Sequence, residues 1–477
     1  MKIKYIVIIG ILNILLFTPV LAFEKSAEIN EFIQGFHDLK QFNGNVLVSQ
    51  NGKVIFEKGF GYANFEWDIK NTPETKFRIG SVTKQFTSML IMQLVQEEKI
   101  NLDKTINFYL KYYRGDTGKK VTLHQLLNHT SGIPDYLRLK DFRKRYSRTS
   151  YSINEFIEKF CSGDLEFEPG TKFRYSNSGY SLLGKIIEEV TGKSYSEVLV
   201  NKILKPLGMK DTGYDSTSTI LKNRANGYEN HLDGYKNADY LDMSIPYSAG
   251  SMYSTARDLM IWDAALYENK LLNTELTKKM YKVSSHRNYA YGWEINKLTK
   301  EDFGKPLTSM THGGGINGFN ASITRIIEDR YLIILLNNTG GAPISGLNRG
   351  ITNILYGKKT TKAKKRISRI LYDEIKLKGI HAAIEKYTDL RNSGEEISER
   401  SLNSFGFKLL RMGLKEEAIA IFKLNTENFL KSSNAYDSLA EAYLSNENKA
   451  MALINFRQSL ALDVGNINAK EAIERLK

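Results

Sequence analysis

A serine and a lysine stand three residues apart at Ser81 and Lys84, in the only Ser-x-x-Lys sequence of the chain. On a helix, residues i and i+3 share a face and lie about 4.5 Å apart along the axis. The amine can therefore reach the hydroxyl, and a serine at a helix start also faces the positive end of the helix dipole. The pair predicts a serine nucleophile activated by an amine. The alternative is an ordinary solvated helix face.

Tyr175 and Asn177, in the sequence Tyr-Ser-Asn, form a second candidate group. A phenol held beside an ammonium group can have a lowered pKa and act as a base near neutral pH. The amide of Asn177 can bond both Lys84 and a substrate carbonyl. We therefore expect Tyr175 to take part in proton transfer and Asn177 to bind substrate. The alternative for Tyr175 is a packed aromatic side chain.

A third group begins at His312, in the only His-x-Gly sequence of the chain, where three glycines follow the histidine. Glycines let a strand edge approach a ligand closely. We expect His312 and Gly314 to line a substrate site, and the N–H of Gly315 to be a second donor to an oxyanion. His312 should be mostly uncharged at neutral pH and gain charge as the pH falls toward 6. The alternative is a glycine-rich loop with an incidental histidine.

The elements that must position these groups are strands at both ends of the first 356 residues and helices between them. Asn51-Gly52 is a two-residue turn signal inside the first pair of strands. Strand patterns cover 45–50, 53–58, 321–327 and 331–337, and helix patterns cover 81–98, 123–128, 153–160, 179–191 and 256–266. This order predicts an α/β (α+β) fold, with one antiparallel sheet made from both ends, flanking helices and an inserted all-helical lobe.

The C-terminal part of the chain is predicted to be a separate all-α repeat domain. Residues 357–366 hold six basic side chains and no acidic one, which is typical of a solvated linker. Beyond it, Ala418 and Phe422 recur 34 residues later as Ala452 and Phe456. A helical period of 34 residues resembles tetratricopeptide repeats, which bind protein partners. Ordinary helical hairpins are the alternative over residues 367–477.

The N-terminus and the composition favour an exported protein. Residues 1–22 have a basic start, an apolar run of signal-peptide length and small residues before Phe23, so the mature hydrolase domain should span 23–356. An uncleaved membrane anchor is the alternative to a periplasmic or secreted protein. The single cysteine, Cys161, excludes an internal disulfide and is expected to be packed. The net charge of +14 suits anionic envelope surfaces, but no nucleic-acid-binding motif accompanies it.

Taken together, the three motifs resemble the serine β-lactamase and DD-peptidase superfamily, whose hallmark begins with Ser-x-x-Lys. The resemblance covers about residues 30–356 and is strongest to the class C β-lactamase-like group, which includes carboxypeptidases, D-amino-acid peptidases, esterases and β-lactamases. It is carried, in the order of the family, by F-R-I-G-S-V-T-K-Q-F at Phe77–Phe86, L-L-N-H-T-S-G at Leu126–Gly132, P-G-T-K-F-R-Y-S-N-S-G-Y-S-L-L-G at Pro169–Gly184, P-L-G-M at Pro206–Met209 and A-G-S-M-Y-S-T-A-R-D-L at Ala249–Leu259.

The resemblance implies a role for each candidate residue. Ser81 would be acylated, and Lys84 and Tyr175 would move the proton. Asn177 would position the substrate, and the N–H groups of Ser81 and Gly315 would form the oxyanion hole. The resemblance implies no metal and no cofactor, and it gives His129, inside the second block, a structural role.

One departure from the family bears on the substrate. True class C β-lactamases typically have Lys-Thr-Gly at the third motif, where this chain has His312 and Gly313. We therefore expect a hydrolase of D-amino-acid peptides, cell-wall-like peptides or esters. The alternatives are a class C-like β-lactamase, and a catalytically weak penicillin-binding or scaffold protein that works through its repeat domain.

Overall fold

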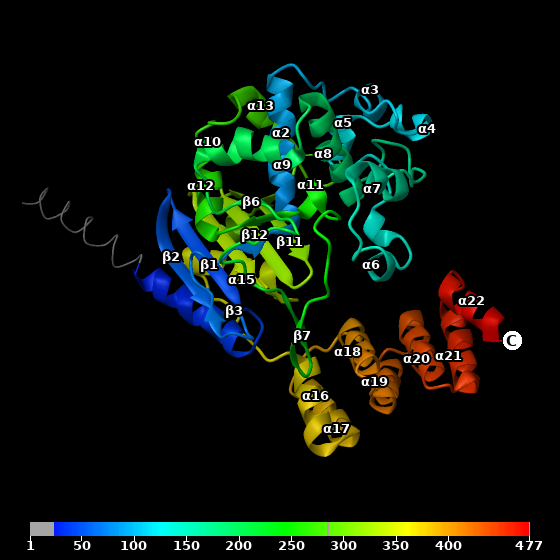
Figure 1. Ribbon diagram of the computed structural model, residues 1–477. Helices are drawn as coiled ribbons and strands as arrows, with labels where there is room; N and C mark the ends of the chain where they lie inside the picture. The colour runs from blue at the N-terminus through cyan, green and yellow to red at the C-terminus, as the bar shows by residue number, and fades with distance from the viewer. Residues whose placement is uncertain (1–22, 284–285, 477) are drawn as a thin grey trace, which may run out of the picture. The chain divides into compact units, whose positions relative to one another are not determined.

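The computed structural model describes residues 23–283 and 286–476, which form two compact units (Figure 1). The first unit comprises the residues up to Asn230 together with Tyr235–Ala363. The second comprises His231–Gly234 and the residues from Lys364 onward. The predicted signal peptide over residues 1–22 lies outside the described residues. None of the helices within the described residues is long and apolar enough to cross a membrane.

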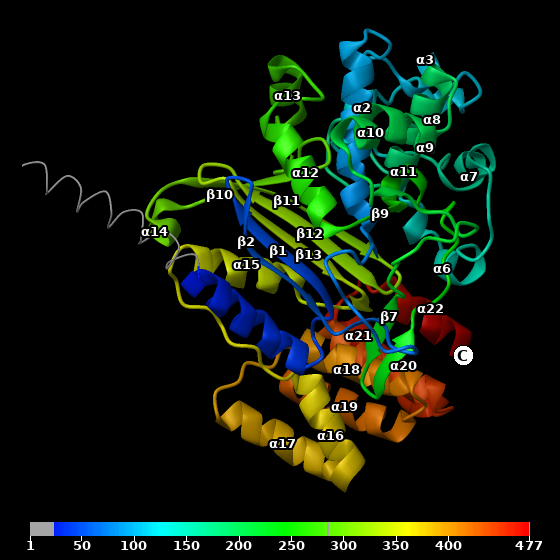
Figure 2. The ribbon, with the colours of Figure 1, turned by 60° about the vertical axis from the view of Figure 1, so that its left-hand side comes forward.

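A six-stranded antiparallel sheet forms the centre of the first unit, with strand order β10-β11-β12-β13-β1-β2 (Figure 2). Its strands are β1 (Gly44–Gln50), β2 (Lys53–Phe60), β10 (Glu294–Leu298), β11 (Leu307–Ile316), β12 (Phe319–Ile326) and β13 (Tyr331–Asn337). β1 pairs with β13 from Gly44 opposite Asn337 to Gln50 opposite Tyr331. The predicted sheet made from both ends of the domain is therefore confirmed.

The hairpin of β1 and β2 follows from its turn residues. Asn51 and Gly52 both have positive φ, of 52° and 74°, which is the backbone that a two-residue type I′ turn requires. Three shorter sheets contain the other strands within the described residues: β3 (Tyr62–Asn64) with β4 (Ile69–Lys70); β5 (Phe77–Arg78), β9 (Met252–Ser254) and β6 (Gly213–Tyr214); and β14 (Thr339–Gly340), β7 (Tyr228–His231) and β8 (Gly234–Asn237).

Helices cover both faces of the main sheet (Figure 2). Side chains alternate along a strand, so Val46 and Val48 of β1 face one side and Leu47 faces the other. The helical residues 23–38 and α15 (Ile344–Leu355) bury apolar side chains on the first face. The opposite face packs against the cluster that contains α2 (Thr83–Gln96) and α12 (Ala256–Tyr267).

The helical lobe lies between the two halves of the sheet in the sequence. Its helices are α3 (Ile106–Tyr109), α4 (Gly115–Gly118), α5 (Leu123–Leu127), η2 (Tyr136–Arg138), α6 (Phe142–Arg145), α7 (Ile153–Phe160), α8 (Asn177–Thr191), α9 (Tyr195–Leu199), η3 (Val200–Leu204), α10 (Lys205–Leu207), α11 (Tyr247–Gly250), α13 (Thr274–Met280) and, near the sheet edge, α14 (Lys300–Phe303). The helix predicted from Ser81 begins instead as a 3₁₀ turn, η1 (Gly80–Val82), and continues as α2.

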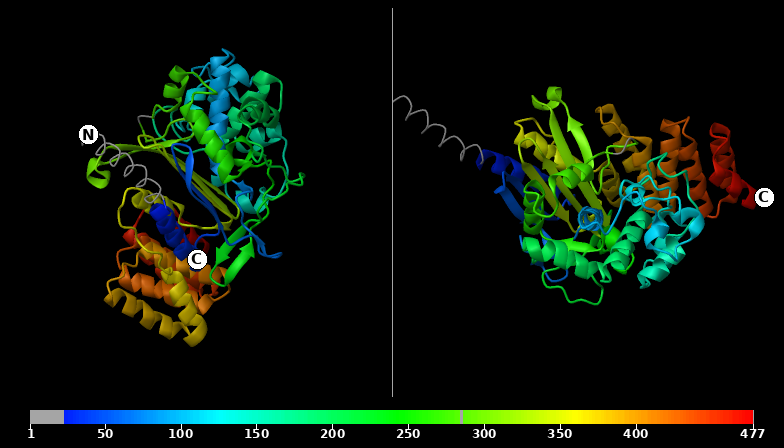
Figure 3. Two further views of the ribbon diagram at one scale, coloured as in Figure 1. Left: turned by 90° about the vertical axis from the view of Figure 1, so that its left-hand side faces the viewer. Right: turned by 90° about the horizontal axis from the view of Figure 1, so that it is seen from above.

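The second unit is a series of helices, as the sequence predicts for the C-terminal region. They are α16 (Ile367–Lys378), α17 (Ile380–Asn392), α18 (Glu399–Arg411), α19 (Lys415–Asn428), α20 (Ser433–Ser445), α21 (Lys449–Leu462) and α22 (Ile467–Leu476). Neighbouring helices pack against each other in the pairs α16–α17, α18–α19, α19–α20, α20–α21 and α21–α22 (Figure 3). The recurring residues Ala418, Phe422, Ala452 and Phe456 are all buried in one apolar cluster, which explains the helical period.

Candidate active site

Ser81 and Lys84 meet where the short strand β5 turns into α2. Ser81 lies in the 3₁₀ turn, and Lys84 is fully buried in the first turn of α2. The Nζ of Lys84 lies 3.2 Å from the Oγ of Ser81. The hydroxyl therefore stands at a helix N-terminus with an amine as its neighbour, where a developing negative charge is stabilised.

Two oxygen atoms orient the amine of Lys84. Its Nζ donates to Oδ1 of Asn177 and to the backbone oxygen of Ala249, each at 2.8 Å. A neutral amine has two hydrogens, and these two acceptors use both. The remaining lone pair can then face the hydroxyl of Ser81 and accept its proton.

The charge state of Lys84 suits this role. Burial lowers the pKa of its ammonium to about 7, and the carboxylate of Asp135 raises the pKa against this trend. A large fraction of the amine is therefore uncharged at neutral pH. An uncharged amine can act as a general base toward Ser81 without further activation.

Tyr175 is also next to the serine, but its protonation differs from the sequence expectation. The side chain of Ser81 is near enough to the Tyr175 hydroxyl to lower the pKa of the phenol, although less than burial raises it. Burial raises the pKa of Tyr175 well above its usual value, although Nζ of Lys84 lies 4.9 Å from the ring centroid. The predicted lowering of this pKa is wrong, because loss of solvation outweighs the nearby amine. The phenol stays protonated and can pass a proton on.

His129 holds the segment that carries Tyr175. Its backbone oxygen accepts from the N–H of Arg174 at 2.9 Å, and its Nδ1 accepts from the N–H of Ser176 at 3.2 Å. These two hydrogen bonds are made by the residues on either side of Tyr175. The ring centroids of His129 and Tyr175 lie 4.2 Å apart. These contacts support the structural role expected of His129.

Asp135 positions Asn177, and sequence reasoning missed it. The Nδ2 of Asn177 lies 3.2 Å from each oxygen of the Asp135 carboxylate, and the backbone N–H of Asn177 lies 3.3 Å from Oδ1. A carboxylate only accepts hydrogen bonds, so the NH₂ group of the Asn177 side chain must point toward Asp135 and its oxygen away from it. The oxygen of Asn177 therefore faces Lys84. The only sequence signal was an acidic residue three positions after the Leu126–Gly132 block.

The third motif lies on β11, close against the nucleophile turn. A Cβ on Gly314 would stand 1.9 Å from the backbone oxygen of Ile79 and 3.1 Å from the N atom of Ser81. A Cβ on Gly80, which has φ +51°, would stand 2.9 Å from the N atom of Gly315. Glycine is thus required at positions 80 and 314 so that the two backbones can meet. This approach places Ser81 and Gly315 on backbone segments that lie against each other, at the position expected for the oxyanion hole.

His312, on the same strand, is buried, and both of its ring nitrogens are engaged. Its Nδ1 lies 2.7 Å from the oxygen of Gly313, which can only accept, so Nδ1 carries the proton. Its Nε2 then accepts from the hydroxyl of Tyr289 at 2.9 Å. Burial, and then Lys84, lower the pKa of His312 to about 3. The predicted gain of charge near pH 6 is therefore wrong, because the imidazole has no access to the solvent that would stabilise its cation.

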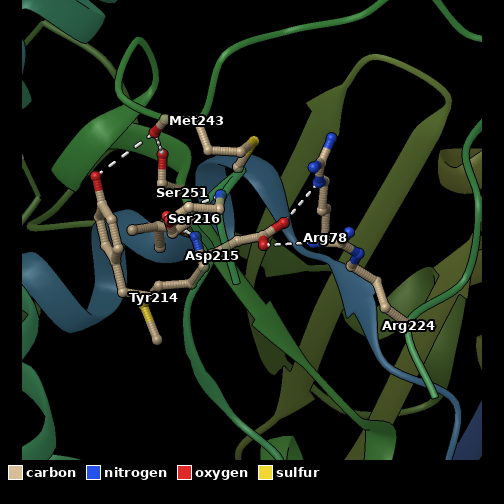
Figure 4. Close-up of polar contacts among 10 residues, drawn as sticks. Arg78, Tyr214, Asp215, Ser216, Arg224, Met243 and Ser251 are labelled. Carbon is tan, nitrogen blue, oxygen red and sulfur yellow. Dashed lines mark hydrogen bonds and ion pairs between the residues drawn. The ribbon is translucent and has the colours of Figure 1, made fainter. Parts of the chain in front are cut away.

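A buried carboxylate anchors the strand that leads to the nucleophile (Figure 4). Asp215 binds Nε of Arg78 at 2.7 Å and a terminal nitrogen of Arg224 at 2.8 Å. The N–H of Asp215 donates to the oxygen of Ser251 at 2.7 Å. Arg78 ends β5 three residues before Ser81, so these bonds fix the entry to the 3₁₀ turn.

No cluster of three or more His, Cys, Asp or Glu side chains that could hold a metal ion occurs within the described ranges 23–283 and 286–476. The groups around Ser81 are the amine of Lys84, the phenol of Tyr175 and, on the far side of the amine, the side-chain oxygen of Asn177. Such a set can carry out acyl transfer from an ester or amide to a serine hydroxyl.

The sequence model of the Beta-lactamase family matches residues 29–352 of the chain. The chain therefore belongs to this family, and it is a serine hydrolase with the β-lactamase/transpeptidase-like fold.

The chain is similar to several named proteins. The chain is 30% identical over 323 residues to teichoic acid D-alanine hydrolase of Staphylococcus aureus, an alignment that covers 66% of this chain and 74% of the relative. The crystal structure of FmtA from Staphylococcus aureus is similar with a TM-score of 0.60 and 28% identity, covering 72% of this chain and 89% of that chain. The D-amino acid amidase of Ochrobactrum anthropi SV3 is similar with a TM-score of 0.60 and 26% identity, covering 70% and 97%.

Proposed function

We propose that this chain removes D-alanyl or related D-amino acyl groups from esters or amides through an acyl-enzyme on Ser81. The names of the similar proteins support the substrate class, because one acts on D-alanine of teichoic acid and another on D-amino acid amides. The observation that carries the mechanism is the amine of Lys84, which lies 3.2 Å from Oγ of Ser81 with a pKa of about 7.

In the proposed acylation, the neutral amine of Lys84 takes the proton of Ser81 as Oγ bonds to the carbonyl carbon. The N–H groups of Ser81 and Gly315 stabilise the oxyanion that forms. When the bond to the leaving group breaks, the alcohol or amine takes a proton from the Tyr175 hydroxyl, which Lys84 then reprotonates. Water attacks the acyl-enzyme by the same steps in reverse, and the free acid is released.

The third motif favours esters and amides over β-lactams. Both ring nitrogens of His312 are engaged inside the protein, and Gly313 carries no hydroxyl. The side chains at these two positions therefore offer no free donor to the carboxylate of a penicillin or cephalosporin. A class C-like β-lactamase is the second candidate, since the acylating groups would be the same.

The proposal extends to where the protein works. Residues 1–22 would export it to the periplasm or beyond, where it would meet the cell envelope, and residues 23–356 would fold as the hydrolase domain. The 34-residue period over 367–477 supports tetratricopeptide-like repeats that bind a protein partner. A catalytically weak scaffold is the remaining alternative, and the intact set of Ser81, Lys84 and Tyr175 speaks against it.

Steady-state kinetics on purified protein test the substrate class. We expect measurable kcat/KM for the methyl ester and the amide of D-alanine, lower values for the L-enantiomers, and poor turnover of nitrocefin. The Ser81→Ala variant should lose about 10⁴-fold or more, as loss of a covalent nucleophile generally does. Faster turnover of nitrocefin than of the D-alanyl compounds would replace this proposal with the β-lactamase.

A further inference from the structure

The helical second unit contains a cavity of about 740 Å³ that the hydrolase mechanism does not use. Its walls come from the segment before α16, the start of α16, the end of α17, the loop after α17 and the first three turns of α18. One lining residue is acidic, and five are basic: Lys364, Lys365, Arg366, Arg400 and Lys408. The lining thus carries a clear excess of positive charge.

Only part of this charge is neutralised by ion pairs. Lys364 pairs with Glu395 at 2.6 Å, and Lys365 pairs with Asp373 at 2.5 Å. Arg400 and Lys408, in contrast, have no carboxylate within ion-pair distance in the described part of the chain. Both lie on α18, and they are two turns of helix apart.

The surroundings of Lys408 add to the unbalanced charge. The side chain is half-buried, and the charged groups that act on it are the cations Arg366, Arg369 and Arg411. Burial and these arginines lower the pKa of its ammonium. Like charges near one another raise the free energy of the folded protein, and an anion bound beside Lys408 would lower it.

The start of α18 contributes further donors to the same cavity. Ser398 caps this 13-residue helix by accepting from the N–H of Ser401, and the hydroxyls of Ser401 and Ser404 lie along the cavity wall. The N-terminal end of a helix carries a partial positive charge. Arginine, lysine, hydroxyl groups and a helix N-terminus together are the donors that bind phosphate oxygens in proteins.

We propose that this cavity binds a phosphate-bearing anion. Its volume exceeds what one carboxylate needs, and its cations come from two separate segments of the chain, the residues before α16 and the helix α18. The anion could be a free small phosphate or one phosphate group of an envelope polymer chain. The proposal is independent of the substrate class proposed for the hydrolase.

Isothermal titration calorimetry on the full chain at 0.15 M salt tests it. This ionic strength screens scattered surface charges beyond about 8 Å. The probes are inorganic tripolyphosphate, a poly(glycerol phosphate) oligomer and, as a carboxylate control, citrate. The test variant is the double substitution Arg400→Gln with Lys408→Gln. The matched control is Lys431→Gln with Lys449→Gln, which removes the same charge from exposed positions of the same unit outside the cavity.

We expect the test variant to weaken phosphate binding about tenfold or more, and the control variant less than twofold. Binding of tripolyphosphate as well as the oligomer would assign the cavity to the phosphate group itself, and binding of the oligomer alone would assign it to a polymer. Equal weakening by both variants, or citrate binding as tight as tripolyphosphate, would overturn the proposal. Thermal unfolding of each variant shows that the helices remain intact, and the cluster predicts that the test variant unfolds at the same or a higher temperature.

Discussion

Replacing Asp135 with Asn should change the reaction in two separable ways. The carboxylate of Asp135 holds the amide of Asn177 through contacts of 3.2, 3.2 and 3.3 Å, and its charge raises the pKa of Lys84. An asparagine keeps the shape but loses the charge and offers a donor as well as an acceptor. The amide of Asn177 is then no longer forced to present its oxygen to Lys84.

The size of the first effect follows from the hydrogen bonds lost. A hydrogen bond to a charged group is worth about 1.5–3 kcal/mol, which corresponds to about a ten- to a hundred-fold change. On the alkaline plateau, where Lys84 is neutral in both proteins, kcat/KM should therefore fall by about this factor. The second effect has a definite sign: without the carboxylate the pKa of Lys84 drops further, so the acid limb of the pH profile moves to lower pH.

The assay is kcat/KM for a D-alanyl ester between pH 5 and 9, with the wild type and Asp164→Asn measured alongside. Asp164 is an exposed partner of Arg114 in the same lobe, so its variant removes one charge without touching the site. A residue with only a structural role would lower the plateau and leave the limb in place. An acid limb that stays fixed, or moves to higher pH, in Asp135→Asn would refute the reasoning.

Three further results are expected. In the wild type kcat/KM should rise with pH through about 7, as the ammonium of Lys84 loses its proton. His312→Gln should leave the midpoint of this rise at the same pH, because the imidazole is already neutral there. Gly313→Ala should retain most activity, since its Cβ meets nothing closer than 3.9 Å. Gly314→Ala should lose at least a hundredfold in activity or fail to fold, because its Cβ would lie 1.9 Å from a backbone oxygen. Similar kinetics for the two variants would contradict the close approach of β11 to the nucleophile turn. A chain ending at residue 357 should be soluble and should react with an acylating fluorescent probe as the full chain does, and an inactive aggregate would show that the C-terminal helices complete the hydrolase.

The parts of the fold that local patterns encode are predictable from the sequence. The alternation around Val46–Val48 and the Asn51-Gly52 turn define the first hairpin. The spacing of Ser81 and Lys84 is enough to predict that the amine approaches the hydroxyl, since the 3₁₀ turn with Ser81 runs directly into the first turn of α2 with Lys84. The period of 34 residues likewise predicts the C-terminal helices.

The protonation states could not be predicted in the same way. A neighbouring amine suggests a lowered pKa for Tyr175, and the usual histidine pKa suggests a charge on His312 near pH 6. Burial instead raises the pKa of Tyr175, and it lowers the pKa of His312 so far that the imidazole stays uncharged near pH 6. The depth of a side chain depends on packing between distant segments, and no local pattern in a single sequence reveals it.

Contacts between distant segments were missed for the same reason. Asp135 and Asn177 are 42 positions apart, and only the packing of the helical lobe brings them together. The basic cavity of the second unit likewise joins the linker cations to Arg400 and Lys408 on α18. The sequence predicts the charge of each of these two segments, but it does not predict that both line the same cavity.

The central claim is that Ser81 carries the acyl group during turnover. Its most direct test is mass spectrometry of the protein after a brief, acid-quenched reaction with the p-nitrophenyl ester of D-alanine. The account predicts a mass increase of one alanyl group, located on the peptide that contains Ser81 and absent from Ser81→Ala. Turnover at the wild-type rate by Ser81→Ala, or an acyl group located on another residue, would contradict it.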